Sequence, residues 1–328
     1  TDAEHDAQRR DFTINALILD PLEAGPEEGT AAHGRIIDFV DGRRDLEAKI
    51  VRAVGEPSRR LDEDLLRALR AVRFACRLGF ELDPATADAI RAHASELTGV
   101  SNERVGEELR KMLAHPARGR AVRMIDDLGL DTPTLGKATA EPPSVLSEDH
   151  DLLTRLADDA GFPLSLSALA LERHGRDPLA ASAADAIVRW RSALCLSNEE
   201  RDACARVLET LTLLRTVWLG EPVARQKHIA MARAVPDAHR LLEAVDQSLA
   251  KRVATRLDEL APVGMGLSPD PLLDGDALIR LGYAPGPLFA RVLDGVYDGQ
   301  LDGRVGDIAS AESLARELAR EYGVQPTA

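Results

Sequence analysis

Two short blocks of charged and polar residues carry the side chains that could do chemistry. The first runs from Arg9 to Asn15 and contains two arginines, an aspartate and an asparagine. The second runs from Glu63 to Phe74 and contains two adjacent carboxylates and three arginines. Arginine forks pair well with phosphates, and an aspartate beside an arginine can match the hydrogen-bonding edge of a nucleobase. These residue types therefore suit the binding of a nucleotide.

The spacing of the second block predicts one continuous helix, because each residue of an α-helix advances by about 100°. The apolar positions share one face of this helix: Leu65, Leu69, Val72 and Cys76. The opposite face holds Glu63, Arg67, Arg70 and Phe74, with Asp64 at its edge and Arg73 at its flank. We therefore expect the helix to present an aspartate and several arginines to a ligand. A solvated helix with ordinary intrahelical ion pairs is the alternative, and spacing alone leaves it open.

Composition limits the class of protein. A chain of 328 residues can hold two or three domains. A net charge of -14 argues against a surface that is uniformly basic, although it leaves room for a local basic groove. The three cysteines form no CxxC pattern, which favours a reduced, cytoplasmic protein. No apolar run approaches the length of a membrane span, so we expect a soluble protein with no membrane partner.

The chain changes character along its length. Short apolar runs bounded by turn residues predict strands at 14–19, 36–40 and 50–54, with a loop at 22–34 and a short helix at 42–49. From about residue 61 the pattern is helical. Near the end, Asp274 can cap a short helix that Gly282 closes. The sequence thus predicts a small mixed α/β part followed by a long helical part.

Several motifs resemble one known family. Residues 10–17 (RDFTINAL) are similar to the RRDFTINAL motif of the bacterial-type tRNA nucleotidyltransferase and poly(A) polymerase family. Residues 38–46 (DFVDGRRDL) resemble the element that follows it there, and residues 54–75 resemble the family's VGdP…EDxLRxLRaxRFA run. The likeness is dense over residues 6–130 and returns at 271–303.

The resemblance implies a mainly α fold, in which a remnant of an α/β nucleotidyltransferase head precedes an α-helical neck, body and tail. The expected domains are a partial head at 1–55, a neck with the nucleotide-recognition helix at 56–130, a linker at 131–150, a helical body at 151–260 and a helical tail at 261–328. The tail is the candidate RNA-binding part.

The resemblance also implies roles for individual residues. Arg10 would contact the sugar or triphosphate of the incoming nucleotide, while Asp64 and Arg67 would read the base edge of CTP or ATP in place of a nucleic-acid template. Arg70 and Arg73 would complete the pocket towards the phosphates. The supporting residues are Asp11 and Asn15, which would brace the pocket, Asp41, Gly42 and Asp45, which would belong to a mobile loop, and Glu63.

Family members hold two Mg²⁺ ions on an Asp-x-Asp pair that follows a Gly-Gly loop. In the family both elements precede the RRDFTINAL motif, so we expect the pair to lie upstream of this chain. The chain would then contain no catalytic and no metal-binding residue, and by itself it would bind nucleotide weakly and catalyse nothing. Asp2, Glu4 and Asp6 are interpreted as a solvated acidic lead-in.

The resulting hypothesis is an enzyme, a template-independent RNA nucleotidyltransferase that adds CCA to tRNA 3′ ends in the cytoplasm. Its expected partners are tRNA or another RNA 3′ end, with CTP and ATP as substrates and Mg²⁺ as cofactor. A poly(A) polymerase of the same family is one alternative. A non-catalytic RNA- or nucleotide-binding fragment is an alternative from another class.

Overall fold

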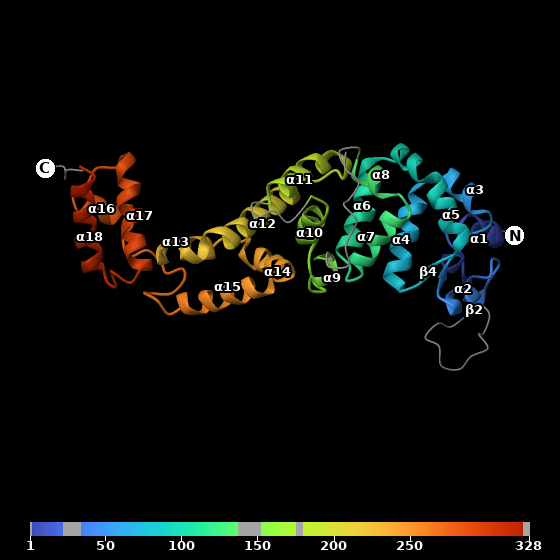
Figure 1. The fold of residues 1–328 in the computed structure, drawn as a ribbon, viewed down its shortest axis with the longest axis horizontal. Helices are drawn as coiled ribbons and strands as arrows, with labels where there is room; N and C mark the ends of the chain where they lie inside the picture. The colour runs from blue at the N-terminus through green and yellow to red at the C-terminus, as the bar shows by residue number, and fades with distance from the viewer. Residues whose placement is uncertain (1, 22–33, 137–151, 175–179, 324–328) are drawn as a thin grey trace. The chain divides into compact units, whose positions relative to one another are not determined.

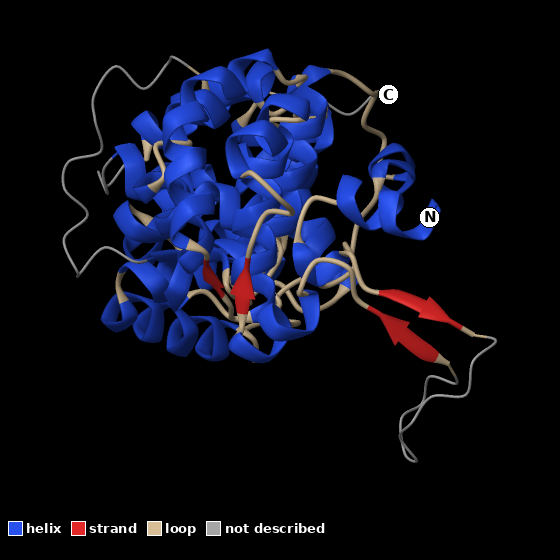
Figure 2. Ribbon diagram, turned by 90° about the vertical axis from the view of Figure 1, so that its right-hand side faces the viewer, coloured by secondary structure: helices blue, strands red, loops and turns tan. Residues whose placement is uncertain are grey.

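The computed structural model describes residues 2–21, 34–136, 152–174 and 180–323. Helices dominate these ranges and the strands are short (Figures 1 and 2). The chain divides into two compact units, one formed by residues 1–176 and 181–205 and the other by residues 177–180 and 206–328. Among the described helices, none combines the length and the apolar character needed to cross a membrane.

The first unit contains most of the elements. In chain order they are α1 (Asp2–Arg9), η1 (Thr13–Asn15), β1 (Ile18–Asp20), β2 (Arg35–Ile37), α2 (Gly42–Ala48), β3 (Ile50–Val51), α3 (Pro57–Glu63), α4 (Leu66–Leu78), β4 (Glu81–Leu82), α5 (Pro84–His93), η2 (Ala94–Gly99), α6 (Asn102–Leu113), α7 (Arg118–Asp127), α8 (Asp131–Leu135), α9 (Leu152–Arg155), α10 (Phe162–His174) and α11 (Ala181–Ala193). Helix α12 (Asn198–Thr216) begins in this unit and ends in the second.

The second unit is helical throughout its described residues. Its elements are η3 (Trp218–Gly220), α13 (Val223–Ala230), α14 (Val235–Val245), α15 (Gln247–Leu260), α16 (Gly275–Arg280), α17 (Pro287–Leu301) and α18 (Ile308–Glu321). The predicted cap at Asp274 is confirmed, because its Oδ1 accepts from the Ala277 N–H at 2.8 Å. Lys227 is fully buried, and its ammonium donates to three backbone carbonyls, those of Val263, Gly266 and Leu301.

The predicted mainly α fold with a few strands is confirmed, although the strands are shorter than expected. β1 and β2 form an antiparallel pair, and β3 pairs with β4 in parallel. Residues 14 and 15, predicted to begin a strand, belong to the 3₁₀ turn η1 instead, because the Ala16 N–H bonds back to the Thr13 carbonyl. Residues 22–33 of the predicted loop and 137–150 of the predicted linker lie outside the described residues.

The predicted single helix across Glu63 to Phe74 is wrong at its start. Helix α3 ends at Glu63, and Asp64 adopts an extended conformation with φ -160° and ψ 102°. The Asp64 carboxylate then accepts from the Leu66 N–H at 3.1 Å, so a new helix, α4, begins there. The apolar stripe of α4 is buried as predicted, while Leu65 stays partly exposed before it. The break places Asp64 at the junction of two helices.

The first sequence block is fixed to the second through a short strand-like contact. Phe12 forms an antiparallel bridge with Ala53. The Thr13 N–H donates to the Arg52 carbonyl at 3.0 Å, and the Val54 N–H donates to the Asp11 carbonyl at 3.2 Å. This contact joins the first block to the segment before α3, and bonds from Arg67 to Arg9 and from Arg70 to Asp11 bring the block beside the α3–α4 junction.

Candidate functional site

The two blocks meet at one cavity of about 540 Å³, which we call the arginine pocket. Eight residues line it: Arg9, Arg10, Asp11, Asn15, Asp64, Arg67, Arg70 and Phe74. Four of the five predicted nucleotide-binding residues are among them, together with the predicted supporting residues Asp11 and Asn15. The structure therefore brings together residues that are more than fifty positions apart in the chain.

Asp11 anchors the floor of the pocket to α4. Both Nε and Nη2 of Arg70 donate to Oδ2 of Asp11, at 2.8 and 2.5 Å. The other carboxylate oxygen, Oδ1, accepts from Nδ2 of Asn15 at 3.0 Å and from the Phe12 N–H at 2.9 Å. Asp11 thus has its lone pairs occupied by protein donors, and its role is to hold Arg70 and the first block in place.

The Arg67 guanidinium is held by groups on both blocks. Its Nη1 donates to Oε2 of Glu63 and to the carbonyl oxygen of Arg60, both at 2.8 Å, and its Nη2 donates to the Arg9 carbonyl at 3.3 Å. The Arg67 bond lowers the pKa of Glu63, so this carboxylate stays ionised near neutral pH. Within the described residues, Nε of Arg67 has no hydrogen-bond partner, which leaves donor capacity for a ligand.

Asp64 is held from the opposite side by Arg104 of α6. Nη2 of Arg104 donates to Oδ2 of Asp64 at 2.7 Å, while Oδ1 accepts from the Leu66 N–H. A carboxylate has about four acceptor positions, so about two remain for a ligand. Arg104 was not singled out in the sequence, because an arginine on a charged helix gives no signal until the fold places it against Asp64.

The two N-terminal arginines of the pocket are the most exposed. Arg10 forms an ion pair with Asp6 of α1 at 2.6 Å, and the Arg9 guanidinium lies 3.8 Å from the same carboxylate. Phe74 adds an apolar wall, which packs edge-on against the buried Phe12 with 5.7 Å between ring centroids. Arg9 and Phe74 lie in the two sequence blocks that indicated a nucleotide site, but no role in the pocket was predicted for either of them.

Arg73, predicted to face the phosphates, does not line the arginine pocket. Its Nε donates to Oε2 of Glu108 on α6 at 2.5 Å, and Glu108 is almost completely buried. The Arg73 guanidinium also lies over the ring of Phe74, 4.4 Å from its centroid. Arg73 lies three positions after Arg70, which places its side chain about 60° away around the helix and towards α6, where the packing of α4 on α6 provides its partner.

The supporting residues at 41–45 form the start of α2, which confirms the short helix predicted at 42–49 and not the mobile loop that the resemblance implied. Asp41 precedes α2 with φ 61°, and Gly42 and Asp45 are buried in its first turns. A Cβ at Gly42 would lie 2.2 Å from the Thr13 carbonyl oxygen. Oδ2 of Asp45 accepts from the Thr13 hydroxyl at 2.7 Å. These contacts place α2 directly beneath the segment that carries Asp11.

The charge of the pocket suits a phosphorylated ligand. Four arginines and two aspartates line it, so the side chains carry a net positive charge. The Asp64 carboxylate keeps about two acceptor positions beside its bonds to Leu66 and Arg104, and Nε of Arg67 is still available as a donor. An acceptor and a donor side by side can read one edge of a base, while the exposed arginines meet phosphate oxygens.

The lining of the arginine pocket does not fit the expected pair of magnesium ions. Each of the nearby carboxylates already pairs with a cation: Asp6 with Arg10 and Arg9, Asp11 with Arg70, and Asp64 with Arg104. Within the described ranges, one group of potential metal ligands has the required closeness, and its members lie outside the lining of the arginine pocket. The lining of the arginine pocket therefore suits the binding of a nucleotide and offers such ions no free pair of carboxylates.

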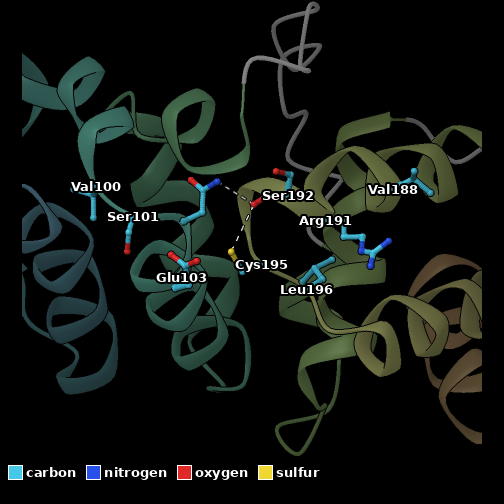
Figure 3. A pocket seen from close by; sticks show the side chains of 9 residues that line it. Val100, Ser101, Glu103, Val188, Arg191, Ser192, Cys195 and Leu196 are labelled. Atoms are coloured by element: carbon cyan, nitrogen blue, oxygen red, sulfur yellow. Dashed lines mark hydrogen bonds between the residues drawn. The ribbon is translucent and has the colours of Figure 1, made fainter.

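A larger cavity of about 700 Å³ lies between the start of α6 and the end of α11 (Figure 3). Its floor carries the bond from Nδ2 of Asn102 to the Ser192 carbonyl at 3.0 Å. The Glu103 backbone N–H, the Ser101 hydroxyl and the Cys195 thiol together lower the pKa of the Glu103 carboxyl, while the Cys195 thiol donates to the Ser192 carbonyl at 3.8 Å. Partial burial and the Glu103 charge raise the pKa of Cys195. The raised pKa favours the protonated thiol, which is a weaker nucleophile than the thiolate.

Two family models match the chain. One describes the poly(A) polymerase head domain and covers residues 1–52. The other describes a probable RNA- and SrmB-binding site of polymerase A and covers residues 79–135. The first includes the Arg9 to Asn15 block, and the second includes α6 with Arg104. The matched regions therefore include the first block of the arginine pocket and flank the second block in the sequence.

Curated relatives and solved structures agree with these matches. The CCA-adding enzyme of Limosilactobacillus fermentum is 30% identical over 304 residues, which span 91% of this chain and 68% of that protein. The CCA-adding enzyme of Geobacillus stearothermophilus is 40% identical over 138 residues, 42% of this chain and 31% of that protein.

Among solved structures, the Bacillus stearothermophilus CCA-adding enzyme in complex with CTP has a TM-score of 0.69 and 25% identity, covering 98% of this chain and 76% of that one. The Thermotoga maritima CCA-adding enzyme complexed with tRNA, at 20% identity, shares the fold with a TM-score of 0.64, covering 98% of this chain and 74% of that one. The head-domain match, the long alignment and the shared fold place this chain in the tRNA nucleotidyltransferase family, among the relatives of CCA-adding enzymes.

Proposed function

We propose that this protein selects CTP and ATP in the arginine pocket for the addition of C, C and A to tRNA 3′ ends. The observation that carries the proposal is the pairing of Asp64 and Arg67 at one cavity, each held by protein contacts that leave free hydrogen-bonding capacity. Relatives that are named CCA-adding enzymes, one of them solved with CTP, support it.

The chemistry of the bases explains why one acceptor and one donor are sufficient. Cytosine and adenine each present an exocyclic amino group next to an unprotonated ring nitrogen. Asp64 accepts from the amino group and Arg67 donates to the ring nitrogen. Uracil and guanine present a carbonyl oxygen next to a ring N–H, which reverses both polarities and leaves the carboxylate facing an oxygen. The pair therefore accepts C and A and rejects U and G.

Arg9, Arg10 and Arg70 supply positive charge for the triphosphate, although Arg10 must exchange its contact with Asp6 for the ligand. The family-model match over residues 79–135 supports an RNA partner. Mg²⁺ remains the ion expected from the resemblance. The three cysteines are free, which is consistent with a cytoplasmic protein.

Equilibrium binding of the four nucleoside triphosphates to the full chain tests the proposal. We expect CTP and ATP to bind at least about fivefold more tightly than UTP and GTP, a difference on the order of one lost hydrogen-bond pair. Arg67→Ala should remove this preference, whereas Arg77→Ala, an exposed arginine in the last turn of α4, should keep it.

Two other results would contradict the proposal. Tight binding of ATP without CTP would favour a poly(A) polymerase, and equal binding of all four nucleotides would favour a non-selective RNA- or nucleotide-binding protein. Incorporation of C and A into tRNA that lacks its CCA end is the corresponding test of activity.

A further inference from the structure

Three potential metal ligands converge outside the arginine pocket, on a surface formed by three elements. Asp62 lies in the last turn of α3, His93 ends α5, and Glu96 lies in η2. Nδ1 of His93 is 3.1 Å from Oε1 of Glu96 and 3.7 Å from Oδ1 of Asp62. All three ligand atoms lie within 4.8 Å of one another. The imidazole is largely buried, whereas both carboxylates are exposed and can adjust.

Hydrogen bonding alone does not satisfy this arrangement. Nδ1 of an imidazole carries at most one hydrogen, and two carboxylate oxygens face it. One hydrogen therefore serves one carboxylate well and leaves the other to water. A divalent cation at the same point would bind all three groups at once.

The distances fit a metal ion of ordinary size. With metal–ligand bonds of about 2.1 Å, the two separations from Nδ1 correspond to ligand–metal–ligand angles of about 95° and about 125°. These values span the octahedral and tetrahedral ranges. Two ligands of one ion lie at most about 4.2 Å apart, so a movement of less than about 1 Å by the exposed carboxylates closes the set.

The ligand types indicate which ion would bind. One imidazole with two carboxylates suits Zn²⁺ and similar first-row divalent ions, whereas Mg²⁺ prefers an all-oxygen shell and retains its waters. We propose that Asp62, His93 and Glu96 form a binding site for a divalent transition-metal ion, with Zn²⁺ as its representative. Water completes the coordination, because the described ranges supply three ligands within reach.

The position of this site ties it to the architecture around the arginine pocket. Asp62 is followed directly by Glu63, which accepts from both Arg60 and Arg67. A bound ion would join the end of α3 to the end of α5 and to η2, and so restrain the turn that leads to Asp64. The ion would stabilise the native state, because it binds the folded arrangement of three elements that are separate in the unfolded chain.

Calorimetric titration of the full chain with Zn²⁺ tests the site. The parent for this test is Cys195→Ser, since Cys195 is an exposed thiol that could bind zinc independently. We expect one site, an apparent Kd at least tenfold weaker after His93→Gln, and a similar loss after Asp62→Asn. His5→Gln changes an exposed histidine with acidic neighbours on α1 and should leave the Kd unchanged.

Thermal unfolding with and without Zn²⁺ gives an independent measure. The parent and His5→Gln should unfold at a higher temperature when Zn²⁺ is present, and His93→Gln should not respond. Circular dichroism shows whether each variant is folded. A Kd that His93→Gln and Asp62→Asn leave unchanged, or the absence of any site in the parent, would overturn the proposal. Either result leaves the proposed nucleotide selection untouched, because none of the three ligands lines the arginine pocket.

Discussion

Asp11 and Arg70 lie 59 positions apart in the chain and form a direct ion pair, with Nε and Nη2 of Arg70 at 2.8 and 2.5 Å from Oδ2 of Asp11. Asp11 retains only 10% of its side-chain exposure. The pair joins the first sequence block to α4 and forms part of the lining of the arginine pocket. Its removal should therefore affect both stability and ligand binding.

We expect Arg70→Ala to lower the free energy of unfolding by about 2 kcal/mol, because it leaves the nearly buried Asp11 carboxylate without its cation. Nucleotide affinity should fall in the same variant. Urea denaturation and CTP binding measure the two effects. Arg77→Ala removes an exposed arginine from the last turn of the same helix and should alter neither. If Arg70→Ala and Arg77→Ala had the same free energy of unfolding and the same CTP affinity, the Asp11–Arg70 pair would contribute to neither.

Arg73 lies on the same helix, but it contacts Glu108 and does not line the arginine pocket. Arg73→Ala removes the main partner of Glu108, which is 3% exposed, and among the described residues leaves it Lys111 at 3.2 Å. We expect a loss of about 3 kcal/mol in the free energy of unfolding. Nucleotide affinity, measured where the variant is still folded, should stay within about twofold of the parent. A large loss of nucleotide affinity in a stable variant would show that Arg73 contributes to nucleotide binding.

Gly42 is predicted to tolerate no side chain. A Cβ there would lie 2.2 Å from the carbonyl oxygen of Thr13, a backbone atom that cannot rotate away. Gly42→Ala should therefore shift the segment that carries Asp11, destabilise the fold by a few kcal/mol and weaken nucleotide binding. Gly99→Ala is the matched control, since a Cβ at that position has no neighbour within 4 Å. Thermal unfolding of the two variants measures the effect. Similar unfolding temperatures would show that a side chain at Gly42 does not destabilise the fold.

The sequence predicted the helical character and most of the pocket, because spacing on one helix determines which side chains share a face. Arg67, Arg70 and Phe74 follow this rule. Asp64 does not, since its own carboxylate caps the next helix and breaks the expected one. Arg73 and Arg104 depend on where α6 packs, and α6 is far away in the sequence. Periodicity describes one element at a time and gives no information about such partners.

Glu200 forms an ion pair with Arg110 whose contribution to stability should depend on pH. Its two carboxylate oxygens accept from Nε and Nη2 of Arg110 at 2.6 and 2.8 Å, which links the start of α12 to α6. The bonds from Arg110 lower the pKa of Glu200 below its ordinary value of 4.5. A carboxyl group with a lowered pKa in the folded state contributes stability above about pH 4.5, and this contribution disappears as the pH falls through the folded-state pKa.

At pH 7 we expect Glu200→Gln to be less stable than the parent by about 1 kcal/mol, a modest value because the pair is partly exposed. The difference should shrink as the pH is lowered towards 3, since the parent then loses the same charge. Glu199→Gln, an exposed neighbour on α12, should show little difference at either pH. Urea denaturation at both pH values measures the gap. A gap of the same size at pH 7 and pH 3 would mean that the amide fails for a reason other than the lost charge.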